Sequence, residues 1–137
     1  MSKVKIAMIG AGNIANAHLE AYKSVPDAEI YAACDINEKR LNETCDKFGI
    51  ERRYTDVDEM LKALPELDAA DVCVWNCSHA DCSVKALNAG LHVLCEKPMA
   101  YNAEQAEEMQ KAAEKNGKLL MIGFVLRFSD EAKIAMD

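Results

Sequence analysis

Short apolar runs alternate with amphipathic segments along the chain, and this alternation predicts strands that are separated by helices. The runs with strand character cover residues 4–9, 29–34, 52–54, 71–75, 91–95 and 119–125. Between them, apolar residues recur at intervals of three or four, as expected of helices, over residues 13–25, 38–48, 57–64, 79–88 and 103–116. Regular alternation of strand and helix favours an α/β fold with a doubly wound, mostly parallel sheet of about six strands and helices on both faces.

Polar residues and glycines mark the ends of these predicted helices. An N-cap side chain accepts a hydrogen bond from the first helical turn, and the expected N-caps are Asn37, Asp56, Ser78 and Asn102. A glycine readily adopts the left-handed conformation that ends a helix, and the expected stop signals are Gly49, Gly90 and Gly117. The predicted helices therefore rest on end signals as well as on periodicity.

A glycine-rich turn joins the first predicted strand to the first predicted helix, with the sequence Gly10-Ala11-Gly12-Asn13-Ile14-Ala15. Gly10 permits a tight turn, and Gly12 lacks a Cβ, so the backbone can approach a pyrophosphate. The N–H groups of the first helical turn, at Asn13 and Ile14, then face the phosphates. This context predicts a Rossmann-type dinucleotide site; the alternative is a glycine turn that only connects strand and helix.

Asp35 supplies the acidic partner of that turn, at the end of the second predicted strand. A carboxylate about 20 residues past the glycine turn accepts hydrogen bonds from a ribose and repels a 2′-phosphate. We therefore expect NAD as the cofactor, with NADP less favoured; the alternative for Asp35 is a helix cap. Arg40 follows about one helical turn later, where it either contacts the adenosine end of a dinucleotide or lies in solvent.

Composition and charge narrow the possible partners. The 137 residues are half hydrophobic and carry a formal net charge of −7, from 16 basic and 23 acidic residues, which suits one domain over residues 1–137. A nucleic-acid partner is not expected, because the chain has no cluster of Lys and Arg. No apolar run approaches the roughly 20 residues that span a bilayer, and the N-terminal stretch leads into the glycine turn rather than a cleavage site. The expected location is the cytoplasm.

The six cysteines are expected to be reduced, because several of them lie in apolar strand-like runs and no signal peptide is evident. A metal site is the alternative, and its ligands would be Cys73, Cys77, His79 and Cys82. We do not expect a metal there, since Cys73 belongs to a strand and Cys82 to a packed helix. His18 is expected to be a packing residue, and His92 is expected to be a core or edge histidine of its strand with its hydrogen bonds satisfied.

A second motif, Glu96-Lys97-Pro98, directly follows the fifth predicted strand. Ligands of open α/β sheets bind at such strand ends, and the proline favours a cis Lys97–Pro98 bond; a plain surface loop is the alternative. Residues 86–98, the opening turn with His18, and residues 123–128 resemble the glucose–fructose oxidoreductase/inositol dehydrogenase (Gfo/Idh/MocA) family. The resemblance covers the whole chain.

The resemblance implies roles for individual residues. Lys97 looks like the family's catalytic lysine, which contacts the reacting hydroxyl and the nicotinamide region, and Glu96 looks like a ligand of the nicotinamide ribose. The other residues that the resemblance places at the cofactor are Asn76, His79, Pro98 and Arg127. Trp75 replaces the family's usual proline, and it either stacks on the dinucleotide or packs under the sheet.

The resemblance also implies an activity that this chain does not complete. Members of the family transfer a hydride between NAD(P) and a sugar, an inositol or a related polyol, and they often form homo-oligomers. Their second domain, which carries the substrate pocket and further catalytic residues, is absent from residues 1–137. We therefore expect cofactor binding without turnover. Two alternatives stay open: a stand-alone nucleotide-binding module, or a parent enzyme that uses NAD transiently for elimination or glycoside hydrolysis.

Overall fold

The computed structural model describes residues 2–136, and within them the strands form one parallel sheet of six. The strands are β1 (Val4–Ile9), β2 (Ala28–Cys34), β3 (Arg53–Tyr54), β4 (Ala69–Val72), β5 (His92–Glu96) and β6 (Leu120–Gly123). Their order is β3-β2-β1-β4-β5-β6, and each neighbouring pair is parallel. The expected doubly wound sheet is confirmed.

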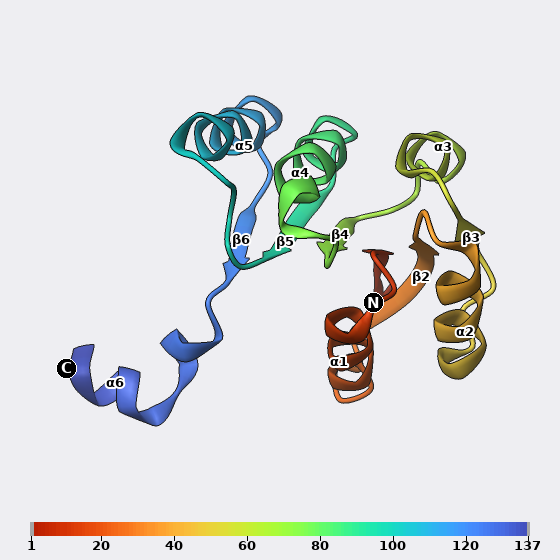
Figure 1. Cartoon of the computed structure of the whole chain (residues 1–137), viewed down its shortest axis with the longest axis horizontal. Coiled ribbons are helices and arrows are strands. Elements are labelled where there is room, and N and C mark those ends of the chain that lie inside the picture. Colours follow the sequence, from red (N-terminus) through yellow and green to blue (C-terminus); the bar gives the residue numbers. More distant parts are fainter. Residues whose placement is uncertain (1, 137) are drawn as a thin grey trace.

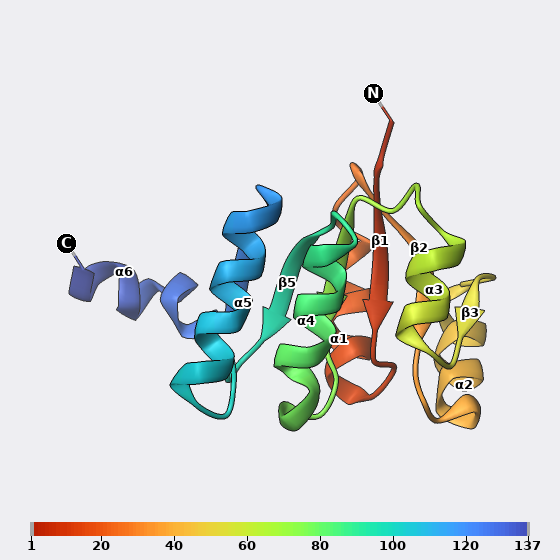
Figure 2. The ribbon, with the colours of Figure 1, turned by 90° about the horizontal axis from the view of Figure 1, so that it is seen from above.

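Helices cover both faces of the sheet (Figure 1). One face carries α1 (Asn13–Tyr22) and α2 (Glu38–Phe48), and the other carries α3 (Val57–Ala63), α4 (His79–Asn88) and α5 (Ala103–Asn116). Figure 2 shows β1 running toward the turn that leads into α1. The carboxyl ends of the strands and the beginning of α1 therefore meet at one edge of the sheet.

Alternation along the strands produces two hydrophobic clusters, one on each face. Ile9 of β1 joins the larger cluster, which includes Met60, Leu87 and Met109 from the three helices of its face. Met8, its neighbour in sequence, joins the smaller cluster beneath α1 and α2. Since each face of the sheet is buried, the strands consist mostly of apolar residues rather than alternating with polar ones.

Most of the predicted helix ends are confirmed. The side chains of Asn37, Asp56 and Asn102 accept hydrogen bonds from the first turns of α2, α3 and α5. Gly49 and Gly117 adopt the left-handed conformation. The prediction of Ser78 as a side-chain cap is wrong, because the 3₁₀ turn η1 (Asn76–Ser78) continues directly into α4 and Ser78 makes no capping hydrogen bond.

The largest differences from the predicted strand boundaries lie in β4 and β6. β4 stops at Val72 instead of residue 75, so Trp75 belongs to a loop. β6 stops at Gly123, and the chain continues through the 3₁₀ turn η2 (Val125–Phe128) into the short helix α6 (Asp130–Met136), beyond the β6 edge of the sheet (Figure 1). The side chains of Phe124, Leu126 and Phe128 are exposed there.

Within the described residues, none of the helices combines the length and the apolar character that crossing a membrane requires.

Candidate functional site

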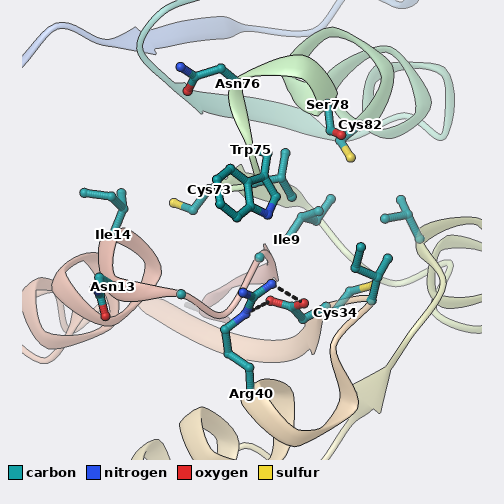
Figure 3. A pocket seen from close by; sticks show the side chains of 16 residues that line it. Ile9, Asn13, Ile14, Cys34, Arg40, Cys73, Trp75, Asn76, Ser78 and Cys82 are labelled. Carbon is teal, nitrogen blue, oxygen red and sulfur yellow. Dashed lines mark hydrogen bonds and ion pairs between the residues drawn. The ribbon is translucent and has the colours of Figure 1, made fainter.

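A cavity with a volume of about 490 Å³ lies at the carboxyl ends of β1, β2 and β4 (Figure 3). The chain order reverses beside β1, and ligands of open α/β sheets bind at such a switch point. Eight of the residues that were predicted to bind a cofactor line this cavity: Gly10, Gly12, Asn13, Ile14, Asp35, Arg40, Trp75 and Asn76. Tertiary structure therefore brings together residues that are up to 66 positions apart in sequence, from Gly10 to Asn76.

Gly10 and Gly12 serve different purposes in the turn. Gly10 has a φ of +101°, and a Cβ at this position would collide with the main-chain carbonyl group of Cys73. A Cβ on Gly12, in contrast, would meet no protein atom within 4 Å, although Gly12 lines the cavity. The fold thus requires glycine at position 10, whereas glycine at position 12 keeps the cavity open beside the backbone.

Side chains from α1 and α2 fix the carbonyl groups of the turn. Thr44 Oγ1 donates to the carbonyl oxygen of Ala11 at 2.8 Å, and Asn16 Nδ2 donates to that of Gly12 at 2.8 Å. Within the described part of the chain, no side chain caps α1 and its first turn holds no acidic residue. The N–H groups at this helix end and the partial positive charge of the helix dipole are therefore available at the cavity.

The Asp35 carboxylate is buried directly beside the turn, with only 5% of the residue exposed. Its Oδ2 accepts hydrogen bonds from Ala11 N at 2.9 Å and Arg40 Nε at 2.8 Å. Its Oδ1 accepts from Asn37 N at 2.8 Å and Arg40 Nη2 at 2.7 Å. Burial alone raises the pKa of Asp35, but the hydrogen bonds from Arg40, Asn37 and Ala11 outweigh burial and lower it, so the group is a carboxylate at neutral pH.

The Arg40 guanidinium therefore does not simply lie in solvent. It forms a two-point ion pair with Asp35 and borders the cavity from α2 (Figure 3). Each oxygen of the Asp35 carboxylate already accepts two hydrogen bonds, which is about its full capacity. A ligand hydroxyl that binds Asp35 must consequently replace one of these four hydrogen bonds, and the two from Arg40 come from a side chain that is 35% exposed.

Trp75 is 72% exposed and lines the cavity from the β4 side, so it does not pack under the sheet (Figure 3). Asn76 follows it in η1 and is also exposed. Ile36, which the sequence analysis did not single out, is another exposed apolar residue of the cavity lining. The available signal in the sequence was the position of Ile36 directly after Asp35, at the end of the second predicted strand.

His79 is buried and joins two loops rather than lining the cavity. Its Nδ1 lies 2.6 Å from the carbonyl oxygen of Pro98, and its Nε2 lies 3.0 Å from that of Val74. The histidine thereby links the loop after β4 to the loop after β5. Its direct contact with a cofactor stays a prediction.

The Glu96-Lys97-Pro98 turn has the expected cis Lys97–Pro98 bond. Lys97 and Pro98 are exposed at the end of β5, and Lys97 N donates to Glu96 Oε2 at 3.1 Å. Arg127 is exposed in η2. The contacts of these residues with a substrate or cofactor also stay predictions.

His18 is a polar link instead of the packing residue that the sequence predicted. Its Nδ1 lies 2.7 Å from Asp71 Oδ2, and its Nε2 lies 2.7 Å from Glu96 Oε1. The hydrogen bond to Asp71 is the largest influence on the ring and, together with Glu96, raises the pKa of His18 to about 9 against the opposing effect of burial. The signal in the sequence was Asp71, a charged residue inside an apolar strand.

Cys73 completes a cluster in which donor atoms of His18, Asp71 and Cys73 lie within 4.8 Å of one another. Burial and the neighbouring Asp71 raise the pKa of the Cys73 thiol, which donates to Asp71 Oδ1 at 3.3 Å. The cluster is therefore explained by hydrogen bonding. Two of the ligands in the alternative metal site of the sequence analysis, Cys77 and His79, lie in different environments. Cys77 is exposed, whereas His79 is buried and each of its ring nitrogens faces a main-chain carbonyl oxygen.

Comparison with known proteins identifies relatives of the chain. A family model described as "Oxidoreductase family, NAD-binding Rossmann fold" matches residues 4–124. The chain is 35% identical over 130 residues to the myo-inositol 2-dehydrogenase of Thermotoga maritima, with 95% of this chain and 39% of the relative covered. It is 38% identical over 129 residues to the D-glucoside 3-dehydrogenase of Escherichia coli, with 93% and 36% covered.

Solved structures give the same picture. An oxidoreductase from Agrobacterium radiobacter in complex with NAD+, L-tartaric acid and magnesium superimposes with a TM-score of 0.88 at 33% identity, covering 93% of this chain and 37% of that structure. The scyllo-inositol dehydrogenase of Lactobacillus casei with bound NAD(H) and scyllo-inositol superimposes with a TM-score of 0.88 at 27% identity, covering 98% and 40%. The chain spans about two-fifths of the length of these relatives.

Proposed function

The chain belongs to the oxidoreductase family with an NAD-binding Rossmann fold, and from this premise we propose that its cavity binds NAD for hydride transfer to or from a sugar, inositol or related polyol. The observation that carries the proposal is that the uncapped beginning of α1 and the Asp35 carboxylate share one cavity. The chain supplies the cofactor half of the site. The substrate half corresponds to the part of the relatives that the chain does not match.

The residues at the cavity fit a dinucleotide. The cavity volume of about 490 Å³ lies in the range of small-molecule sites. The space beside Gly12 lets a pyrophosphate approach the N–H groups of Gly12, Asn13 and Ile14, and the dipole of α1 favours its negative charge. When bound, NAD supplies the chemistry of hydride acceptance and return.

Asp35 and Arg40 together hold the adenosine end in this proposal. A ribose hydroxyl donates to the Asp35 carboxylate in place of one hydrogen bond from Arg40, and the released guanidinium covers the adenine side of the cavity. A 2′-phosphate would bring like charge against the buried carboxylate, which favours NAD over NADP. Because the positive charge of Arg40 offsets part of that repulsion, we expect NADP to bind more weakly than NAD rather than to be excluded.

The remaining residues serve the nicotinamide end and the substrate. Trp75 offers an aromatic face to the dinucleotide, and Asn76 offers an amide beside it. Glu96 contacts the nicotinamide ribose, and Lys97 orients the reacting hydroxyl and takes part in moving its proton. His79 and Pro98 shape the loops around this end, and Arg127 lies at the substrate side. In this proposal residues 1–137 bind the cofactor, and Lys97 alone does not complete the proton transfer.

Calorimetric titration of the folded chain with NAD and, separately, NADP tests the proposal. We expect NAD to bind more tightly, and Asp35→Ala to weaken NAD binding and to reduce the preference. Asp46→Ala, which removes an exposed carboxylate from the same helix as Arg40, is the matched control and should leave both affinities unchanged. Folded protein that binds neither dinucleotide at millimolar concentration would contradict the proposal.

Trp75 provides a second measurement, because it is the single tryptophan of the chain. Stacking of an aromatic ring on the indole should quench its fluorescence as NAD binds. Trp75→Phe should retain most of the affinity, whereas Trp75→Ala should lose about tenfold, as expected for the loss of one stacked aromatic contact. Equal affinities for these two variants would remove Trp75 from the site.

A further inference from the structure

A charged link crosses the sheet edge between α1 and the Glu96-Lys97-Pro98 turn. His18 of α1 contacts Asp71 of β4 through Nδ1 and Glu96 of β5 through Nε2, each at 2.7 Å. Tyr22 OH donates to the same Asp71 oxygen at 2.9 Å, and the Cys73 thiol donates to the other one at 3.3 Å. Asp71, Glu96, Tyr22 and Cys73 are thus the titratable groups around the His18 ring in this link.

Counting hydrogens shows which form of His18 makes these contacts. A carboxylate only accepts hydrogen bonds, so each ring nitrogen that faces one must carry a hydrogen. The ring is therefore an imidazolium ion, and it neutralises one of two carboxylates that would otherwise repel each other across the ring.

Glu96 is held from several sides by this arrangement. His18 binds Oε1 and the main-chain N–H of Lys97 binds Oε2, while Gly123 of β6, which pairs with Glu96, has no side chain to crowd the carboxylate. Each oxygen of the Glu96 carboxylate therefore has a hydrogen-bond partner that holds its orientation. Its orientation and the beginning of the Lys97 turn depend on the ring of His18.

We propose that His18 is a positioning residue for the nicotinamide end of the site: as an imidazolium between Asp71 and Glu96, it fixes the carboxylate of Glu96 and the main chain of Lys97. The part of this proposal that concerns cofactor affinity rests on the proposed NAD site. Asp71, which is fully buried, anchors the ring, and Glu96 is the partner that receives it.

Loss of the second proton separates the two partners. A neutral imidazole can donate to only one carboxylate. We expect it to keep the hydrogen bond to Asp71, because the Asp71 side chain is 0% exposed whereas that of Glu96 is 14% exposed, and a more deeply buried carboxylate loses more when its hydrogen bond is removed. Deprotonation therefore releases Glu96. The pKa of His18, raised to about 9, sets the pH at which this happens.

Binding of NAD compared with that of ADP tests the proposal, because ADP occupies only the adenosine and phosphate end. His18→Gln should weaken NAD binding about tenfold and leave ADP binding within twofold, as the loss of one charge-assisted contact at the nicotinamide end would do. The NAD-to-ADP affinity ratio of the unaltered chain should fall as pH rises through about 9, and that of His18→Gln should stay flat. Tyr22→Phe, which removes a hydrogen bond to Asp71 but none to His18, is the control and should behave as the unaltered chain does.

Nuclear magnetic resonance gives a readout that needs no cofactor. The ring nitrogens of His18 should both carry hydrogens at neutral pH, and His18→Gln should accelerate hydrogen exchange at the Lys97 amide. A neutral ring, or unchanged Lys97 exchange in the variant, would overturn the proposal. If the unaltered chain binds no NAD while these two results hold, the proposed NAD site fails and the positioning role stands.

Discussion

The charged His18 link makes the stability of the fold depend on pH in a predictable direction. The pKa of His18 rises from 6.5 in the unfolded chain to about 9 in the folded one, because of its hydrogen bonds to Asp71 and Glu96. Between these values the folded chain binds the proton that the unfolded chain has lost. Stability from this group is therefore complete below pH 6.5 and is lost as pH rises through about 9.

The size of the effect follows from the shift. A displacement of about two and a half pKa units corresponds to about 3 kcal/mol of unfolding free energy at 1.36 kcal/mol for each unit. Only 19% of the His18 side chain is exposed, so solvent screens the interaction modestly.

Urea denaturation followed by circular dichroism measures this contribution across the alkaline range. Other groups also titrate there, so the informative quantity is the difference in unfolding free energy between the unaltered chain and His18→Gln at each pH. From neutral pH upward that difference should decrease steadily, and it should be nearly gone once pH passes about 9. Two curves that run parallel from neutral to alkaline pH would refute the assignment of a charged ring between two carboxylates.

Three further substitutions test other parts of the structure. Gly10→Ala should reduce the unfolding free energy by about 2 kcal/mol or more, because the new Cβ meets the Cys73 carbonyl group at a positive φ; a normal denaturation midpoint would contradict this. Gly12→Val should lower the denaturation midpoint much less than Gly10→Ala does, since a Cβ there meets no protein atom within 4 Å, and should lose NAD affinity at least about tenfold in calorimetry; tight binding would place the phosphates elsewhere. Asn102→Ala should cost about 1 kcal/mol in urea denaturation by removing the cap that accepts from Gln105 N, and an unchanged midpoint would show that solvent replaces the cap.

Local sequence determined the elements and the phosphate turn. Periodicity located the strands and helices, and end signals such as Asn37 and Gly49 predicted helix boundaries that the structure confirms. These predictions succeed because capping and left-handed turns involve residues only a few positions apart. The failure at Ser78 shows the limit: capping-box spacing was present, but the preceding 3₁₀ turn had already begun the helical path.

The adenosine end of the candidate site could be described only by combining the sequence with the tertiary structure. The sequence predicted that Asp35 follows the second strand, and the parallel pairing of β1 with β2 brings its carboxylate to the amide of Ala11. The sequence left two roles open for Arg40, and only the folded arrangement showed that its guanidinium occupies both oxygens of Asp35. The sequence likewise allowed Trp75 either to stack on the dinucleotide or to pack under the sheet. The structure excludes packing under the sheet, because β4 ends at Val72 and Trp75 is exposed.

What the sequence alone determined, then, is the alternating parallel fold, the glycine turn and the resemblance to an oxidoreductase family, because each resides in short-range patterns. What tertiary structure decided is the link of His18 to Asp71 and Glu96, which lie 53 and 78 positions further along the chain. A hydropathy pattern records that a position faces inward, and His18 does face inward. It does not record which residues of distant strands arrive at the same place, and for a titratable ring those neighbours set both its charge and its role.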